Sequence, residues 1–260
     1  MSGIHPSAVI ADGAVLGEGC SIGPFCVVGP QVVLGAGVTL KSHVVITGDT
    51  HLGPDSTVFP FAVVGEIPQD LKFGGEETRL RIGARARIRE HVTVNTGTAG
   101  GGGLTQVGDD CLLMAGCHIA HDARLGHRVI VVNSSAVAGH CVIEDDVIIG
   151  GLSGIHQFVR IGQGAIIGAL SMVTADVIPH GLVMGARGEL EGLNLVGLKR
   201  RGVSRGDITA LRAAFMTLKE GDGTFHARAE RLGSEHDSPY VRQLMDFVLG
   251  DSERGYLTPR

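Results

Sequence analysis

The chain has 260 residues, a formal net charge of −5, 41 glycines and few aromatic residues (4%). This charge gives no support to a nucleic-acid partner, which needs a broad basic field, so any anionic ligand must be held by local groups. The N-terminus lacks the basic start and apolar stretch of a secretory signal, and no apolar run reaches about eighteen residues. We therefore expect a cytoplasmic protein without stable membrane insertion.

An aliphatic residue recurs at every sixth position along most of the chain. A first run extends from Ile4 to Val64, and a second, from Val107 to Val173, also has a small or β-branched residue four positions after each aliphatic one. A period of six is too long for an amphipathic helix and is the signature of a parallel β-helix of stacked coils. We therefore predict a β-solenoid of hexapeptide repeats. Glycines after the aliphatic residue, such as Gly17, are expected to adopt backbone angles that other residues avoid.

Two insertions interrupt this repeat. The first covers about 66–81 and carries Asp70 and Lys72, and the second covers about 95–106 and contains four consecutive glycines. Insertions in repeat proteins gather on one side and often carry function, because the rigid coils hold their ends in place. Asp70 and Lys72 are therefore candidate ligand contacts, with a solvated loop as the alternative. The glycines predict a flexible lid or turn, because no strand and helix flank them as in a phosphate-binding loop.

The repeat also predicts which residues lie above one another. With three hexads in each coil, residues eighteen apart stack at a spacing of ~4.8 Å. This register places Asp122 on His140, His121 on Gly139 and Gln157, and Ala120 on Ala138 and His156. Polar residues that are distant in the chain are thus expected to converge on one edge.

All five cysteines occupy the small inward position of their hexads: Cys20, Cys26, Cys111, Cys117 and Cys141. At such a position a thiol is a compact apolar filler. We therefore predict neither disulfides nor a metal site built on cysteine.

Beyond Pro179 the period of six ends and the spacing of apolar residues becomes helical. Ser204 predicts the N-cap of a helix that ends at Gly221, and further helices are expected over about 225–232 and 238–249. These helices would cap the open end of the solenoid, as repeat proteins require.

We therefore divide the chain into a β-helix over 1–187 and a small α-helical domain over 188–260. The linker between them concentrates positive charge at Lys199, Arg200 and Arg201. Adjacent cations in an otherwise acidic protein favour anion binding, and a solubilising basic turn is the alternative.

The predicted polar edge suggests a site for acyl transfer. Its members are His118, His121, Asp122, Gly139, His140, His156 and Gln157, without the serine–histidine–acid order of a nucleophile triad. In one interpretation Asp122 holds His121 as a general base, and the backbone N–H of Gly139 receives the oxyanion of a tetrahedral intermediate. This arrangement would transfer an acyl group directly from a thioester to a hydroxyl.

Two alternatives come from other classes of protein. In the first, three histidines bind zinc and the protein is a hydrolase or hydratase. His118 and His121 are three residues apart on an extended segment and should point to opposite sides of a wall, which argues against a metal held by one coil. We therefore predict no metal. The second alternative, a purely structural β-helix, leaves the polar edge and both insertions unexplained.

Several segments together are specific for one family. The sequence contains GPFCVVGP, GEIPQDLKF, GGGLTQVGDDCLLM, HIAHD, AGHCVIEDDVIIGG, IHQFVRIG and GLKRRG. Over nearly its whole length the chain resembles the UDP-N-acetylglucosamine O-acyltransferases, which catalyse the first step of lipid A synthesis. The resemblance implies a left-handed β-helix and a homotrimer with sites between subunits. It also implies an (R)-3-hydroxyacyl donor carried on the phosphopantetheine of acyl carrier protein, with no further cofactor.

The same resemblance implies roles for individual residues. His121 would remove the proton from the sugar 3-hydroxyl while Asp122 orients it and the Gly139 N–H holds the oxyanion. Substrate contacts are implied for Asp70, Lys72, His118, His140, His156, Gln157, Asn194, Arg200 and Arg201. Selection of acyl length is implied for Ala169, Met172 and Arg187.

The sequence departs from the family pattern at two places. Val196 stands where well-known members carry a carboxylate, and Asn95–Thr96 stand where many read His-Arg. The contacts that read the nucleotide base are therefore left open. The alternative within the fold is a related N-acyltransferase that acts on a glucosamine amine, which normally carries an extra N-terminal domain, whereas here the hexads begin at Ile4.

Overall fold

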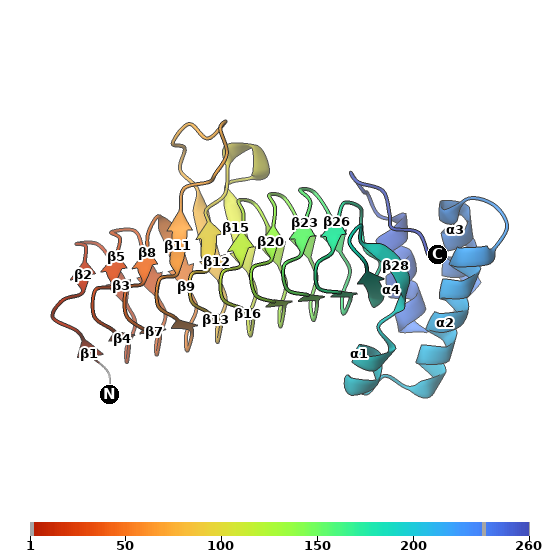
Figure 1. Ribbon diagram of the computed structural model, residues 1–260, viewed down its shortest axis with the longest axis horizontal. Helices are drawn as coiled ribbons and strands as arrows, with labels where there is room; N and C mark the ends of the chain where they lie inside the picture. The colour runs from red at the N-terminus through yellow and green to blue at the C-terminus, as the bar shows by residue number, and fades with distance from the viewer. Residues whose placement is uncertain (1–2, 236–237, 260) are drawn as a thin grey trace.

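The computed structural model describes residues 3–235 and 238–259. Short strands stack into a long three-walled prism, and helices lie beyond its last coil (Figure 1). Within each wall of the solenoid, neighbouring strands are parallel and come from successive coils, as in the pairing of Leu112 with Ile130, and among the described strands only the last pair of the first wall is antiparallel. The predicted β-helix of hexapeptide repeats followed by a helical domain is confirmed.

The three walls are three separate sheets. The first contains β1 (Gly3–Ile4), β4 (Ser21–Ile22), β7 (Thr39–Leu40), β10 (Thr57–Val58), β13 (Arg87–Ile88), β16 (Leu112–Leu113), β19 (Ile130–Val131), β22 (Ile148–Ile149), β25 (Ile166–Ile167), β27 (Gly181–Met184) and β28 (Glu189–Leu193). The second contains β2 (Val9–Ile10), β5 (Val27–Val28), β8 (Val45–Ile46), β11 (Val63–Glu66), β14 (Thr93–Asn95), β17 (His118–Ile119), β20 (Ala136–Val137), β23 (Gly154–Ile155) and β26 (Met172–Val173). The third contains β3 (Val15–Leu16), β6 (Val33–Leu34), β9 (Asp49–Leu52), β12 (Arg79–Ile82), β15 (Leu104–Val107), β18 (Arg124–Leu125), β21 (Val142–Ile143) and β24 (Arg160–Ile161).

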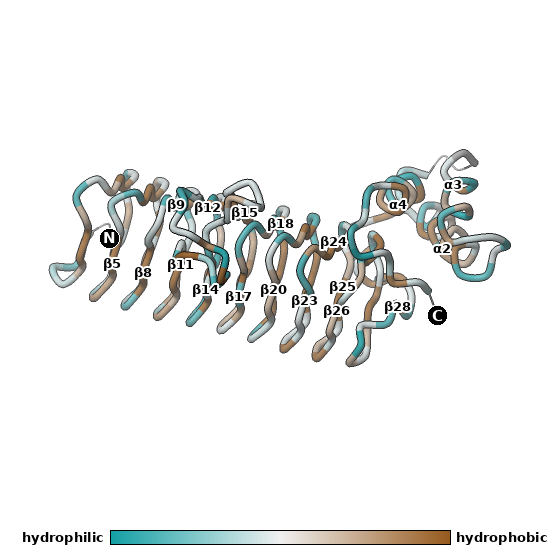
Figure 2. Tube along the Cα trace, turned by 90° about the horizontal axis from the view of Figure 1, so that it is seen from above, coloured by the Kyte–Doolittle hydropathy of each residue, from teal (hydrophilic) through white to brown (hydrophobic). Residues whose placement is uncertain are grey.

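The core runs the length of the prism as ladders of aliphatic side chains. Ile88, Leu113 and Val131, one above another in the first wall, are fully buried. Apolar segments recur from coil to coil along the solenoid (Figure 2). The five cysteines are free thiols, and they are buried in this core at the inward positions predicted for them. Each coil therefore buries its neighbours, and no separate globular core is needed.

The corners use glycine differently from our expectation. Gly17 has an ordinary backbone angle, but a Cβ there would lie 2.5 Å from the backbone nitrogen of Ala36 in the next coil. Positive φ angles occur at other positions, both at glycines such as Gly19 and at residues with side chains such as Asp122 and His140. The prediction for Gly17 was therefore wrong: it permits the close approach of the next coil and does not adopt a left-handed conformation.

Both insertions leave the prism at the same edge, between the second and third walls (Figure 1). The first connects β11 to β12, and the second connects β14 to β15 through the short 3-10 helix η1 (Ala99–Gly101). The coil that follows them carries β17 and the corner after it. The insertions therefore lie beside the coil that holds His121.

In the described part of the chain, four helices follow the solenoid: α1 (Leu195–Arg200), α2 (Arg205–Glu220), α3 (Phe225–Glu235) and α4 (Pro239–Leu249). Ser204 caps α2 by accepting a hydrogen bond from the Asp207 N–H, and Gly221 ends it, as predicted. Helix α1 was not predicted, because its segment was interpreted as a basic turn. The C-terminal segment returns to the last coil, where Tyr256 forms a β-bridge with Asp176.

Candidate active site

The HIAHD segment places His121 and Asp122 at a corner of the prism. Ile119 points inward and is fully buried, and His121 and Asp122 form the turn between β17 and β18. Asp122 has a φ of 59°, a left-handed conformation that aspartate tolerates better than most residues. Its backbone N–H donates a 2.8 Å hydrogen bond to Oγ1 of Thr105, which fixes the turn.

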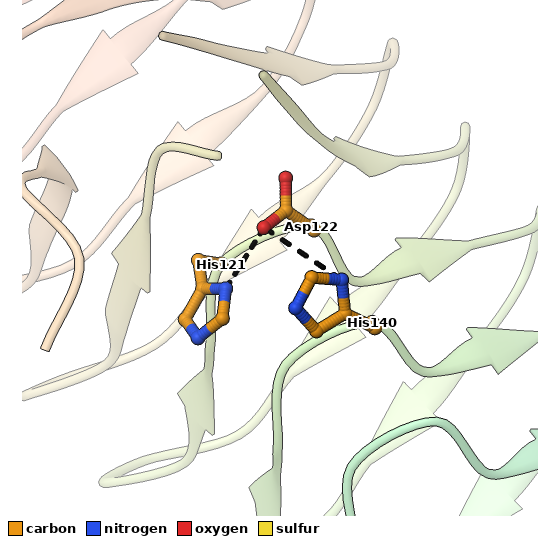
Figure 3. A group of neighbouring side chains, drawn as sticks. All are labelled: His121, Asp122 and His140. Carbon is orange, nitrogen blue, oxygen red and sulfur yellow. Dashed lines mark hydrogen bonds and ion pairs between the residues drawn. The ribbon is translucent and has the colours of Figure 1, made fainter. Parts of the chain in front are cut away.

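The Asp122 carboxylate is buried and fully hydrogen-bonded. It accepts bonds from the Thr98 N–H (2.9 Å) and the Thr98 hydroxyl (2.6 Å), and from Nδ1 of His121 (2.8 Å) (Figure 3). Its side chain is only 1% exposed. The second insertion therefore holds the carboxylate, a role that the sequence analysis did not predict for Thr98.

The glycines of the second insertion make this contact possible. A Cβ on Gly101 would overlap the Asp122 carboxylate, and a Cβ on Gly97 would lie 2.8 Å from its Oδ1. The glycine-rich segment was predicted as a lid or turn. In the structure this segment brings its backbone close to the buried Asp122 carboxylate, which residues with side chains at these positions could not approach.

His121 faces outward with a defined tautomer. Because a carboxylate only accepts hydrogen bonds, the neutral imidazole carries its proton on Nδ1 towards Asp122 and a lone pair on Nε2. A Cβ on Gly139 would lie 2.7 Å from that Nε2, so only glycine fits beside the ring. The lone pair can therefore accept a proton from a ligand next to Gly139.

Gly139 is the first residue of the corner one coil further on. Its carbonyl accepts a hydrogen bond from the Phe158 N–H, whereas its own N–H forms no hydrogen bond within the described part of the chain. A residue with a free N–H beside a general base can supply the hydrogen bond that stabilises an oxyanion.

The His140 ring packs against His121 and also lies close to the Asp122 carboxylate. Its ring stacks on Phe158 with centroids 4.5 Å apart and meets His121 edge-on at 5.0 Å (Figure 3). Its Nδ1 lies 3.9 Å from Asp122 Oδ2. Burial lowers the pKa of His140, more than the neighbouring carboxylate raises it. His140 is therefore a neutral ring at neutral pH.

His118 lies on the same face as His121, contrary to our expectation. Both rings line one cavity, because His118 points outward from β17 and the turn at His121 breaks the strand alternation. Nδ1 of His118 is 2.8 Å from the Thr93 hydroxyl, and burial lowers the pKa of His118. The expectation of opposite sides was wrong because it extended strand geometry through a corner.

Two cavities flank the His121–Asp122 pair. One, of about 470 Å³, is lined by Gln69, Asn95, His118, Ala120, His121, Ala136, Ala138, Gly139, His156 and Gln157. The other, of about 320 Å³, is lined by Asp70, Lys72, Phe73, Glu76, Thr98, Ala99, Gly100, His140 and Phe158. The structure thus brings eight of the predicted site residues around one edge but divides them between two cavities. Gln69 and Asn95 were missed because neither residue type alone indicates a site.

His121, Asp122 and His140 could in principle hold a metal ion, since one potential ligand atom from each lies within 4.8 Å of the others. However, Asp122 Oδ2 already accepts hydrogen bonds from the Thr98 hydroxyl and from Nδ1 of His121. A metal would have to displace the interaction that orients the imidazole. The donor set therefore does not fit a metal, and we derive no step through one.

The remaining predicted residues lie towards the helical end. Asn194 is buried: its Oδ1 caps α1 by accepting from the Gly197 N–H, and its Nδ2 donates to the Gly164 carbonyl. Arg201 donates to Nδ1 of the buried His180 at 3.0 Å, whereas Arg200 is exposed.

The three candidate acyl-length residues lie on coils beyond Gln157. Met172 is on β26, next to Gly154 in the second wall, and is 54% exposed. Ala169 and Arg187 are also exposed.

Comparisons with known proteins agree with this fold. Residues 13–48 and 140–175 match the family described as "Bacterial transferase hexapeptide (six repeats)". The chain is thus a transferase of the hexapeptide-repeat class. Residues 176–257 match the family described as "Udp N-acetylglucosamine O-acyltransferase; Domain 2".

Whole-chain relatives define the family more closely. The chain is 64% identical, over 78% of its length and 77% of the relative, to the acyl-[acyl-carrier-protein]–UDP-N-acetylglucosamine O-acyltransferase of Paracoccus denitrificans. It is 50% identical to the enzyme of the same name from Rhizobium johnstonii, over 98% of this chain and 94% of that one. The chain therefore belongs to the family of UDP-N-acetylglucosamine O-acyltransferases.

Solved structures of the family have the same architecture. A crystal structure of a UDP-N-acetylglucosamine acyltransferase superposes with a TM-score of 0.96 at 40% identity, covering all of both chains. The Campylobacter jejuni enzyme gives a TM-score of 0.93 at 38% identity, covering 99% of this chain and 100% of that one. Among the residues that the structure describes, no helix has the length and apolar character needed to cross a bilayer.

Proposed function

We propose that this protein transfers an (R)-3-hydroxyacyl group from acyl carrier protein to the 3-hydroxyl of UDP-N-acetylglucosamine, the first step of lipid A synthesis. The observation that carries the proposal is the His121–Asp122 pair, whose imidazole ring lies against Gly139, a residue with a free N–H. The relatives' names give acyl carrier protein and UDP-N-acetylglucosamine as their substrates. General-base catalysis at this pair accounts for that reaction without a cofactor.

The reaction follows from the positions of these three groups. Nε2 of His121 takes the proton as the sugar oxygen attacks the thioester carbon, and the Gly139 N–H stabilises the oxyanion that forms. The buried Asp122 carboxylate stabilises the imidazolium. Collapse of the intermediate forms the ester and expels the pantetheine thiolate, which recovers the proton from His121. A general base accelerates such a reaction by ~10²–10⁴-fold, and an oxyanion donor accelerates it by a further ~10²–10³-fold. Together these accelerations suffice for acyl transfer from a thioester, which is already an activated acyl donor.

The two cavities suggest how the substrates divide. Ala120, Ala136 and Ala138 form an apolar strip beside His121 that suits methylene groups. Asp70 and Lys72 lie with His140 in the other cavity, where charged side chains suit the diphosphate side of a sugar nucleotide, while its reacting sugar must reach the polar part of the first cavity beside His121. His156 and Gln157 lie at the end nearer the helical domain, towards Met172. We assign them to the acyl-pantetheine, and Arg200 to the acidic carrier protein.

We further propose that the protein is a homotrimer. The site lies on the outer face of the second wall, so a neighbouring subunit could cover it. The same wall exposes apolar side chains near the N-terminus, among them Val9 (62% exposed) and Val27 (43%). Sedimentation equilibrium tests this directly, and a monomer at micromolar concentration would contradict it.

The test of function is incubation with UDP-N-acetylglucosamine and a series of 3-hydroxyacyl carrier proteins. Ester formation at the sugar 3-position is expected, and His121→Ala should lower the rate by ~10²–10⁴-fold with an unchanged fold. Chelators should leave the rate unchanged. A fully active His121→Ala enzyme, or transfer only to an amino sugar, would contradict the proposal.

A further inference from the structure

Asn95, the last residue of β14, presents a buried hydrogen-bond acceptor that has no partner. The residue is 3% exposed, and its Oδ1 forms no hydrogen bond within the described structure. Its Nδ2 donates to the carbonyl oxygens of Ile67 (3.0 Å) and Glu66 (3.3 Å). These two carbonyls fix the orientation of the amide, because reversing it would set Oδ1 against two other acceptors.

The residue that carries this acceptor lines the cavity that contains His121. Asn95, Gln69 and His118 form a polar part of that cavity, whereas Ala136 and Ala138 form an apolar part. A buried acceptor without a partner costs free energy, and native structures keep few of them. An unpartnered oxygen in the wall of a ligand cavity is therefore best explained by a donor that arrives with the ligand.

We propose that Asn95 binds the acceptor sugar by accepting a hydrogen bond at Oδ1 from a ring hydroxyl or from the acetamido N–H. This inference rests on the proposed function and adds a residue that selects the acceptor. A neutral oxygen acceptor repels phosphate and carboxylate oxygens, so its partner is a hydroxyl or amide of the sugar and not the diphosphate. Methylene groups of the acyl chain have no donor to offer, and the acyl 3-hydroxyl is kept out of the test by measuring binding without the acyl donor.

The other half of the Asn95 amide ties this contact to the first insertion. Nδ2 holds the carbonyls of Glu66 and Ile67, where the insertion leaves β11. The insertion then supplies Gln69 to the same cavity and Asp70 and Lys72 to the other. The planar amide of Asn95 therefore holds the start of this insertion through Nδ2 and, because it is rigid, also fixes the direction of its own acceptor oxygen Oδ1.

The test is a cycle of variants and ligand analogues, measured as dissociation constants by calorimetry without the acyl donor. The ligands are UDP-N-acetylglucosamine, its 3-deoxy, 4-deoxy and 6-deoxy forms, and the form with hydrogen in place of the acetamido group. Asn95→Leu, which keeps the shape and removes the acceptor, should weaken binding of the parent about tenfold. The analogue that lacks the donor bound by Asn95 should bind the wild-type protein about tenfold more weakly than UDP-N-acetylglucosamine does. Asn95→Leu should bind this analogue and UDP-N-acetylglucosamine with the same affinity.

Equal weakening of all five ligands by Asn95→Leu would overturn the inference, because it would show that Asn95 serves only the insertion. Asn95→Ala takes the place of Asn95→Leu in the cycle if the latter does not fold. Ser171→Ala is the matched control: it removes another buried polar atom without a partner, but at an inward position of the solenoid, and should leave every constant unchanged. Failure of wild type to bind UDP-N-acetylglucosamine would instead overturn the proposed function.

Discussion

The hydroxyl of Thr98 donates a 2.6 Å hydrogen bond to Oδ2 of Asp122, the same oxygen that Nδ1 of His121 reaches at 2.8 Å. The second insertion, which lies outside the repeat, thus holds the carboxylate that orients the candidate base His121. The carboxylate side chain is 1% exposed, so water cannot replace the hydroxyl. Asp122 therefore depends on Thr98 for its orientation.

Thr98→Val should therefore reduce catalysis with little effect on sugar binding. A hydrogen bond to a charged group is worth ~1.5–3 kcal/mol, so kcat should fall by about 10- to 100-fold. Steady-state kinetics would show this fall at a nearly unchanged KM. Thr98→Ser keeps the hydroxyl and should retain most activity. If valine and serine behaved alike, the hydroxyl would have no part in supporting the base.

Gly139→Ala should abolish transfer without unfolding the chain. The added Cβ would lie 2.5 Å from the His121 ring, which must then move away from its position beside Asp122. Gly154→Ala is a matched control, because it lies in the same wall and its Cβ would meet nothing within 4 Å. Circular dichroism should show both variants folded, and the assay should show only Gly154→Ala active. Comparable rates for the two would remove Gly139 from the mechanism.

Much of the solenoid could be predicted because its constraint is local and repeated. Each hexad sets its own two inward positions, so the stacking of Asp122 beneath His140 and of His121 beneath Gly139 followed from counting along the sequence. The same logic failed wherever the chain left a strand. The direction of His118 relative to His121 was mispredicted because a corner separates them.

The residues that hold the site residues in place could not be predicted, because they lie in segments outside the hexapeptide repeat. Thr98 and Asn95 belong to the second insertion and its approach, and nothing in their spacing relates them to Asp122 or His121. Helix α1 was missed for a similar reason: its six residues are too few to show helical periodicity, and its cap, Asn194, was assigned to a ligand. Such contacts depend on the path of an irregular loop, which a repeat does not specify.

Arg200 and Arg201 should behave differently, although the sequence treats them as a pair. Arg201 donates to the buried Nδ1 of His180, so Arg201→Ala leaves an unpaired acceptor and should cost about 1–3 kcal/mol of unfolding free energy. Arg200 is exposed at the end of α1, and Arg200→Ala should leave stability unchanged but raise the KM for carrier protein several-fold, most strongly at low salt. Denaturant titration and kinetics at two salt concentrations separate the two effects. Identical behaviour of the two variants would contradict this division.

His180 should make stability fall under acid conditions. Burial, with a smaller effect from Arg201, lowers the pKa of His180 to about 4 in the folded protein, from an ordinary value near 6.5. Between these values the unfolded chain binds a proton that the folded chain does not, so stability decreases as the pH falls from about 6.5 to 4. The full loss is on the order of 3 kcal/mol. His180→Gln removes this titration, and a melting temperature with the same pH slope in both proteins would exclude His180 as its cause.

Acyl length provides the last prediction. If Ala169 forms the blind end of an acyl groove, each additional CH₂ contributes ~0.8 kcal/mol until the chain meets that wall, after which overpacking costs ~1–3 kcal/mol. Preference should then fall steeply beyond one length. Ala169→Gly removes a methyl group and should shift the optimum to a longer chain, whereas Ala169→Met should shorten it by several carbons. Relative kcat/KM for donors of stepped length measures the shift. An unchanged order of preference would mean that Ala169 does not limit the chain, and Met172, exposed on the wall that carries the cavity, would be the next residue to vary.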